Sequence, residues 1–211
     1  MRSQSLSLLS PVSHPSLSSQ YRDRIIFLQK PLDDELANQL IATVLYLDSE
    51  DNAKDLKLYI NTMGGDIVPT LALHDTLKYV TSPVSTVAFG AAFGAAAFLL
   101  ATGDKGRRAA LPNTRIMLHH PSGAARGQAS DIDNEARELM RTRNYVNRVL
   151  SAATGRSLKR IQHDFNRNCY FDVDEAIQYG LIDKVLPPPR TVQQELAESL
   201  AAKSSYPKSW A

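Results

Sequence analysis

The chain has 211 residues, of which 43% are hydrophobic and 22% are charged, and its formal net charge is +2. These values are typical of one soluble globular domain, and the small net charge gives no indication of binding to nucleic acid or to an anionic membrane. The single cysteine, Cys169, excludes an internal disulfide framework and a cysteine-built zinc site.

The N-terminal segment differs in composition from the rest of the chain. Residues 1–20 contain eight serines and no acidic side chain. Such a bias occurs in transit peptides, but the prolines and the lack of an apolar face favour a disordered or divergent arm. We expect the domain itself over residues 21–189, ended by Pro187–Pro189, and a polar tail over residues 190–211.

The first two strand–helix units follow this arm. Residues 24–28 are typical of a buried strand, and either Asp33 or Asp34 can cap the helix that follows. A second strand is predicted at residues 56–60 and its helix at about 68–79. The first helix has apolar positions at a helical period, namely Leu36, Leu40, Ile41, Val44, Leu45 and Leu47.

The pattern continues with a third strand at residues 84–89, a helix at about 94–101 rich in Ala and Gly, and a fourth strand at 115–119. Repeated strand–helix units predict parallel strands with helical crossovers, so the expected class is α/β. Small residues dominate the apolar stretch 84–102, which suits tight internal packing better than a membrane span.

A long helix is expected after the small, flexible run at residues 122–128. Ser130 is a plausible N-cap. Acidic residues dominate the first half of this helix and arginines the second half, as the helix dipole favours. Its apolar stripe requires a partner surface. Two shorter helices are predicted at about 158–165 and 174–179.

Two glycine-rich turns, at 64–65 and 90–94, each follow a predicted strand and open a helix. Backbone N–H groups in such turns can hold an anion or a developing oxyanion. Neither turn has the spacing of a phosphate loop, and the histidines lack metal-ligand spacing. No metal or other cofactor is therefore expected.

Several motifs, in order along the chain, resemble the proteolytic subunit of the Clp protease. The resemblance extends over about residues 22–186 and implies a crotonase-like spiral of strand–helix units with a protruding handle helix. In that family, a Ser-His-Asp triad hydrolyses peptide bonds inside a chamber of stacked heptameric rings. The motifs are YINTMGG at 59–65, AFLLATG at 97–103, LPNTRIMLH at 111–119, GQASDI at 127–132 and EAIQYGLID at 175–183.

The resemblance places the three triad positions at Gly94, His119 and Asn168. Glycine has no nucleophile, so no acyl-enzyme can form there. An asparagine cannot stabilise an imidazolium as a carboxylate does. The chain is therefore predicted to be a pseudoenzyme. A nucleophile relocated to Ser122 or Ser130 is disfavoured, because neither residue lies at a strand-to-helix turn.

Other parts of the site carry over by the same resemblance. The backbone N–H groups of Gly65 and Ala95 match the oxyanion hole of the family, so a peptide could bind without being cut. The alternative interpretation is that these groups only close a turn and start a helix, and that His119 is a leftover histidine with ordinary hydrogen bonds.

The resemblance also implies assembly surfaces. Gln128 and Arg167 match contacts between rings, where the family pairs an acid with the arginine. Asn166 occupies the acid position here, so we hypothesise that Arg167 pairs with an acid of a different, active subunit.

A cleft that docks the Clp/Hsp100 ATPase is implied at Lys57, Tyr59 and Tyr79. Lys57 replaces another aromatic residue of the family, which argues against docking on this subunit alone. The ATPase is therefore expected as a partner only through the assembled ring.

The predicted function is a catalytically inactive structural or regulatory subunit of a mixed-ring, ATP-dependent Clp protease core, like the R-type subunits of cyanobacteria and plastids. Its expected location is the cytoplasm or, alternatively, the chloroplast stroma, with no nucleic-acid or membrane partner. Two alternatives remain open: a crotonase-like acyl-CoA enzyme and a homo-oligomeric peptide-binding module.

Overall fold

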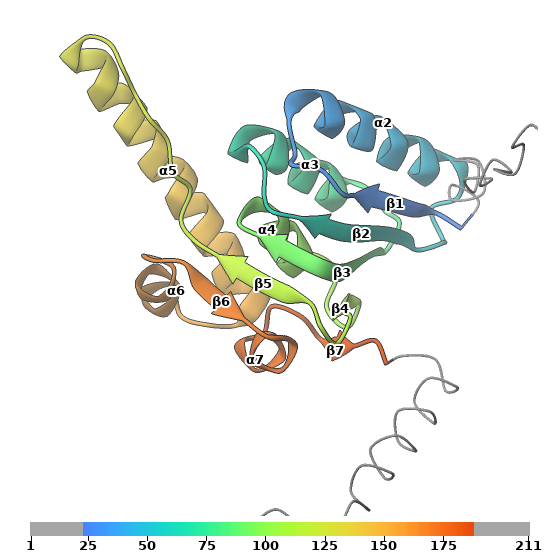
Figure 1. Cartoon of the computed structure of the whole chain (residues 1–211). Coiled ribbons are helices and arrows are strands. Elements are labelled where there is room, and N and C mark those ends of the chain that lie inside the picture. Colours follow the sequence, from blue (N-terminus) through green and yellow to red (C-terminus); the bar gives the residue numbers. More distant parts are fainter. Residues whose placement is uncertain (1–22, 188–211) are drawn as a thin grey trace, which may run out of the picture.

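Strands and helices alternate along residues 23–187, the part of the chain that the computed structural model describes (Figure 1). The N-terminal arm and the C-terminal tail predicted from the sequence lie outside these residues. The elements are β1 (Ile25–Leu28), α2 (Asp34–Glu50), β2 (Leu56–Thr62), α3 (Ile67–Tyr79), β3 (Val84–Phe93), α4 (Ala95–Ala101), β4 (Arg108–Ala110), β5 (Arg115–Leu118), α5 (Ala129–Thr154), α6 (Leu158–Asp164), β6 (Cys169–Phe171), α7 (Val173–Tyr179) and β7 (Lys184–Val185).

The strands form one sheet, with the order β1-β2-β3-β4-β7 and a branch in which β5 pairs with both β3 and β6. Every pairing is parallel except that between β5 and β6. Parallel neighbours require crossover connections, and helices supply them for the first strands of the sheet. The predicted α/β class and the crotonase-like fold of the Clp proteolytic subunit are thereby confirmed.

Strand β3 is longer than the sequence predicted, because it continues through Gly90 instead of ending at Phe89. Its first half pairs with β4 and its second half with β5. Gly90 separates the halves with a φ of +72°, and the Asn61 side chain accepts a hydrogen bond of 3.2 Å from the next N–H group, that of Ala91. The long strand brings the β3–α4 turn up to the end of β5.

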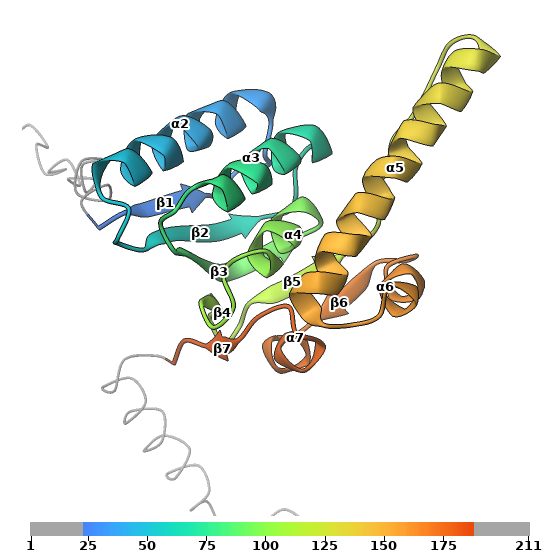
Figure 2. The ribbon, with the colours of Figure 1, turned by 180° about the vertical axis from the view of Figure 1, so that it is seen from behind.

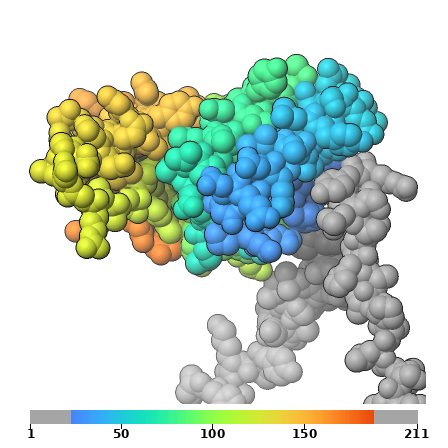
Figure 3. Space-filling view, turned by 90° about the horizontal axis from the view of Figure 1, so that it is seen from above, coloured from blue at the N-terminus to red at the C-terminus, as the bar shows by residue number. Residues whose placement is uncertain are grey.

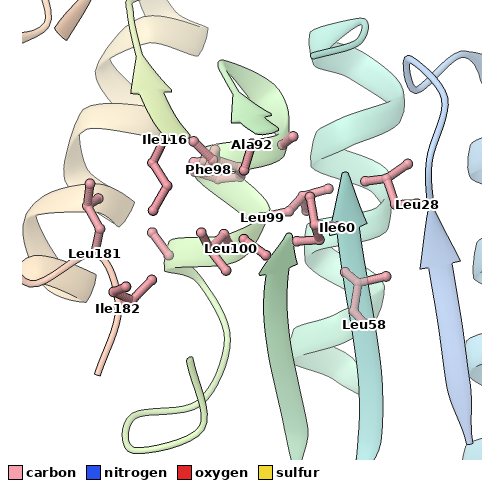
Figure 4. Packing of buried hydrophobic residues seen from close by; sticks show 14 of the residues in the cluster. Leu28, Leu58, Ile60, Ala92, Phe98, Leu99, Leu100, Ile116, Leu181 and Ile182 are labelled. Atoms are coloured by element: carbon pink, nitrogen blue, oxygen red, sulfur yellow. The ribbon is translucent and has the colours of Figure 1, made fainter. Parts of the chain in front are cut away.

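The hydrophobic core contains buried residues from the sheet and from each of the helices α2 to α7. Strand β2 alternates buried with more exposed residues, and Figures 1 and 2 show α2 and α3 together over one face of the sheet. Helix α4 is almost fully buried. Figure 4 shows its Leu99 and Leu100 between Ile60 on one side and Ile116 and Leu181 on the other.

Helix α5 projects from this body together with the segment before it (Figures 1 and 3). It has 26 residues, and its only buried residues are Val146, Asn147 and Leu150, all in its second half. The predicted protruding handle is therefore present.

The capping prediction for the handle helix was wrong. Helix α5 begins at Ala129 with Gln128 as its N-cap, so Ser130 lies within the first turn. Gln128 has an extended backbone whose carbonyl oxygen accepts from the N–H groups of Asp131 and Ile132. By contrast, the cap predicted at Asp33 is confirmed, since its carboxylate accepts a 2.8 Å hydrogen bond from the N–H of Leu36.

Three short strands, β4, β6 and β7, were missed. Within residues 23–187, no helix has the length and apolar character needed to cross a bilayer. The same residues contain no cluster of three or more His, Cys, Asp or Glu arranged to hold a metal ion.

Candidate functional site

A cleft of about 540 Å³ lies at the carboxyl ends of β2, β3 and β5. Its lining includes Gly65 from the β2–α3 turn, Gly94 and Ala95 from the β3–α4 turn, and His119 after β5. The carboxyl ends of parallel strands are where α/β proteins bind their ligands. The structure thus brings four of the residues singled out from the sequence into one place.

Gly94 forms the sharp turn between β3 and α4. Its φ is +53° and its ψ is −114°, a conformation that residues with a side chain adopt only at a cost. Two hydrogen bonds hold the turn: the Gly94 N–H donates to the carbonyl oxygen of Met117 at 2.8 Å, and the Gly94 carbonyl accepts from the N–H of Phe98 at 3.0 Å. The turn is therefore tied to both β5 and α4.

The His119 imidazole faces this turn. A Cβ atom built on Gly94 would lie 3.1 Å from the Nε2 atom of His119. On the other side of the ring, Nδ1 lies 2.7 Å from the carbonyl oxygen of His120. A carbonyl oxygen only accepts, so Nδ1 carries the proton, and in the neutral ring Nε2 presents its lone pair to Gly94.

Two backbone N–H groups are free at this cleft. The loop before α2 pairs with the β2–α3 turn through Leu32. The Leu32 N–H donates to the carbonyl oxygen of Gly64, and the Leu32 carbonyl oxygen accepts from the N–H of Asp66. The N–H of Gly65, between them, and that of Ala95, the first residue of α4, have no acceptor among the described residues. Both belong to residues that line the cleft.

Gly65 has no room for a side chain. Its φ is +156°, and a Cβ atom there would lie 2.4 Å from the backbone nitrogen of Leu32. Real Cβ atoms essentially never approach a backbone atom so closely, so the close approach of the two chain segments requires glycine.

Asn168 lies elsewhere. It is exposed in the loop before β6 and lines a second cavity, also of about 540 Å³, which shares His119, Pro121 and Ser122 with the cleft. It makes no hydrogen bond with His119, whose Nδ1 is occupied by the backbone carbonyl of His120. The structure therefore brings Gly94 and His119 together but leaves the third predicted triad position outside this pair.

The residues predicted at assembly surfaces are dispersed. Gln128 is exposed at the start of α5, and Arg167 is exposed beside Asn168.

Of the residues predicted to dock an ATPase, Lys57 and Tyr59 lie on one face of β2, whereas Tyr79 ends α3 and is 81% exposed. No ring contact joins Tyr79 to Tyr59 in residues 23–187. The Tyr59 ring instead lies 5.5 Å from that of Phe27 and 6.3 Å from that of Phe89. Sequence reasoning missed these two aromatic partners of Tyr59. Phe27 and Phe89 lie next to buried residues of β1 and β3, and this alternation was a usable signal.

A second omission is His120, next to the residue that the motif singled out. Its Nε2 atom is buried without a hydrogen-bond partner. Burial, followed by the nearby positive charge of Arg143, lowers the pKa of His120, and the Asn147 amide opposes this shift only in part. The adjacent pair His119-His120 in the sequence was the available signal.

The cleft has parts that a hydrolase uses, namely two N–H groups without an acceptor among the described residues and an imidazole, but Gly94 provides no hydroxyl group to attack a carbonyl carbon. Fold and cleft together define a protein with the architecture of a serine hydrolase and a glycine at the turn where α4 begins.

The chain belongs to the Clp protease family, whose profile matches residues 12–189. It is 49% identical over 170 residues to the ATP-dependent Clp protease proteolytic subunit-related protein 2, chloroplastic, of Arabidopsis thaliana, a match that covers 81% of this chain and 61% of the relative. The chain thus matches about three fifths of the length of that relative.

Two further relatives are similar over most of their length. The ATP-dependent Clp protease proteolytic subunit 1 of Gloeobacter violaceus is 48% identical over 164 residues, covering 78% of this chain and 83% of the relative. The ATP-dependent Clp protease proteolytic subunit of Chlorella vulgaris is 46% identical over 165 residues, with 78% and 82% covered. The family resemblance inferred from the motifs is confirmed.

Proposed function

We propose that this chain is a non-catalytic subunit of a mixed-ring, ATP-dependent Clp protease core, in which active proteolytic subunits cut the substrate. Its compartment is the cytoplasm of a cyanobacterium or the chloroplast stroma. The observation that supports the proposal most strongly is Gly94, which occupies the turn before α4 with His119 aimed at it.

Loss of the nucleophile is the chemical basis of the proposal. Covalent catalysis needs an atom that attacks the carbonyl carbon, and position 94 has only hydrogen on Cα. At position 168, asparagine replaces the carboxylate that would stabilise a charged imidazole, a change that costs a triad protease about 10⁴ in rate.

A role in peptide binding is a second candidate. The N–H groups of Gly65 and Ala95 belong to residues that line the cleft, and they can donate hydrogen bonds to a peptide carbonyl oxygen. A homo-oligomeric peptide-binding module would retain peptides without an active partner. The acyl-CoA alternative has less support, because it rests on a shared strand–helix spiral and a backbone oxyanion hole without a serine, and no feature specific to CoA accompanies them.

Two surfaces support assembly in the proposal. We infer that Arg167 pairs with a carboxylate of an active subunit, because its own neighbour at position 166 is an amide and it has no ion pair among the described residues. In the proposed assembly, exposed Gln128 and the exposed outer part of α5 form the remaining contact between the two rings.

We also infer that the ATPase docks on the assembled ring beside Lys57, Tyr59 and Tyr79. The Tyr59 ring and its neighbours Phe27 and Phe89 are partly exposed on the sheet face that α2 and α3 leave uncovered. Aromatic side chains of this kind are frequent anchors in protein interfaces.

The test is co-expression of this chain with each active Clp proteolytic subunit of the same organism, followed by native mass spectrometry. We expect both chains in one ring, and peptidase activity that disappears when the active subunit loses its serine. Hydrolysis of a peptide ester by this chain alone, blocked by a serine-directed inhibitor, would contradict the proposal. A ring of this chain alone that retains peptide would favour the peptide-binding module.

A further inference from the structure

The second cavity, which shares His119, Pro121 and Ser122 with the cleft, is strongly cationic. It lies between the segment after β5, helix α5 and the loop between α6 and β6. No acidic residue lines it. We call it the cationic pocket and define it by six of its polar lining residues, His120, Ser122, Arg143, Asn166, Arg167 and Asn168.

The two guanidinium groups of the cationic pocket lack partners. Neither Arg143 nor Arg167 makes an ion pair or a side-chain hydrogen bond with any residue from 23 to 187. Elsewhere in the same domain, buried Arg108 pairs with Asp183 at 2.6 Å, and even exposed Arg160 pairs with Asp164 at 2.7 Å. Arg115, Arg126 and Arg148 also lack such partners among residues 23–187, so what distinguishes Arg143 and Arg167 is that they line one cavity together.

Burial makes the lack of a partner costly for the Nε atom of Arg143, whereas Arg167 is exposed. The Nε atom of Arg143 and the Nε2 atom of His120 are both buried without a hydrogen-bond partner. Buried polar groups are nearly always satisfied in folded proteins, and a charged group that is left unpaired costs the most.

We propose that the cationic pocket binds a compact oxyanion, held by the guanidinium groups of Arg143 and Arg167. Guanidinium groups bind carboxylate and phosphate oxygens through paired, charge-assisted hydrogen bonds. Ser122 and the amide groups of Asn166 and Asn168 supply further donors around the cavity. Because two positive charges face the cavity, a doubly charged anion binds more tightly than a singly charged one.

Two sources share this chemistry: a free anion such as phosphate, and the carboxylate of another subunit that we infer as the partner of Arg167. The site itself does not depend on the proposed function, since its residues all belong to this chain.

The first experiment uses the purified full chain and inorganic phosphate, acetate and chloride at matched ionic strength, with binding measured by calorimetry. We expect saturable binding of phosphate, weaker binding of acetate and none of chloride. Arg143→Gln and Arg167→Gln should each weaken phosphate binding roughly tenfold. The matched control is Arg148→Gln, on the same helix but outside the pocket, which should bind phosphate as the wild type does.

A second variant, Asn166→Asp, places a carboxylate in the pocket and should remove phosphate binding while the chain stays folded. Absence of saturable binding, equal binding of phosphate and acetate, or equal loss in all three arginine variants would overturn the proposal.

The same titration on the complex with an active subunit distinguishes the two sources. Loss of phosphate binding on co-assembly assigns the pocket to a partner carboxylate, and retained binding assigns it to a free anion. Failure of co-assembly would contradict the proposed function, but it would leave the result on the purified chain intact.

Discussion

The Nε2 atom of His119 lies 3.1 Å from the position that a Cβ atom on Gly94 would occupy. The imidazole is held there by the carbonyl oxygen of His120, 2.7 Å from Nδ1. A backbone acceptor thus fixes the ring and its tautomer without a carboxylate. The imidazole thus lies beside position 94 in a chain that has no hydroxyl group there.

We therefore expect Gly94→Ser to make the chain reactive toward a serine-directed fluorophosphonate. Nε2 accepts the hydroxyl proton, and the N–H groups of Gly65 and Ala95 face the developing oxyanion. Because φ at position 94 is +53°, the same variant should lose about 1–3 kcal/mol of stability. Covalent labelling followed by mass spectrometry measures the first effect, and denaturant unfolding the second.

Gly106→Ser is the matched control for this experiment. Gly106 is exposed, has a φ of +83° and has nothing within 4 Å of an added Cβ. It should show a similar loss of stability and no labelling. Labelling of both variants, or of neither, would contradict the inferred role of His119.

Adding Asn168→Asp to Gly94→Ser should raise peptide-ester hydrolysis at least about tenfold, and in triad proteases the corresponding difference reaches about 10⁴. The reason is that a carboxylate stabilises the imidazolium formed in the transition state. The increase requires Nδ1 to exchange the His120 carbonyl for the new carboxylate. Steady-state kinetics of the two variants measure it, and equal rates would mean that the carbonyl keeps its place.

Gly65→Ala should destabilise the fold by more than about 2 kcal/mol, because its Cβ would lie 2.4 Å from the Leu32 nitrogen and the two backbone segments must separate. Gly155→Ala serves for comparison: Gly155 also has a positive φ, +75°, but an added Cβ there meets nothing within 4 Å. It should cost about 1 kcal/mol. Urea unfolding of both variants gives the comparison, and equal losses would refute the role of the close contact.

Asp183→Asn should cost about 3 kcal/mol at neutral pH, because it leaves the Arg108 guanidinium buried without its carboxylate. The two side chains are 22% and 4% exposed, respectively. The neighbouring pair offers a control in Asp55→Asn, since Arg107 and Asp55 are partly exposed and their pair is worth at most about 1 kcal/mol. Thermal unfolding should show a clearly larger loss of stability for Asp183→Asn than for Asp55→Asn.

The pH dependence of the same pair follows from its pKa. Burial raises the pKa of Asp183, but hydrogen bonds from the Arg108 side chain and backbone and from the Gly106 N–H outweigh it, so the pKa is lowered. The unfolded value is about 3.9, so the stabilisation is complete above that pH and is lost as the pH falls through the lower folded value. In Asp183→Asn, stability should therefore fall less steeply as the pH is lowered through this range. An unchanged fall in stability would show that other carboxylates cause it.

The sequence predicted the strands and helices whose apolar residues are local and periodic. It missed β4, β6 and β7 because their pairing depends on distant parts of the chain. Strand β4 contains Arg108, a residue that argues against a buried strand until its partner Asp183 is known, 75 positions away. Short strands stabilised by such contacts have no local signature.

The candidate site was likewise only partly predictable from the sequence. The motifs singled out Gly65, Gly94 and His119, and the structure brings these residues to one cleft. The hydrogen bond of Nδ1 to the next carbonyl was not predictable, since it depends on the backbone path after β5. The cationic pocket was equally hidden, because Arg143 and Arg167 approach each other only when α5 folds back beside the α6–β6 loop.

Every residue from 129 to 138, the outer part of α5, is exposed in the single chain. An isolated helical segment of that length is marginal in water. In the mixed ring proposed above, an incorporated copy would cover this segment, whereas a copy left outside the ring would expose it to cellular peptidases. On that proposal, the difference would allow orphan subunits to be removed and the stoichiometry of the ring to stay in balance.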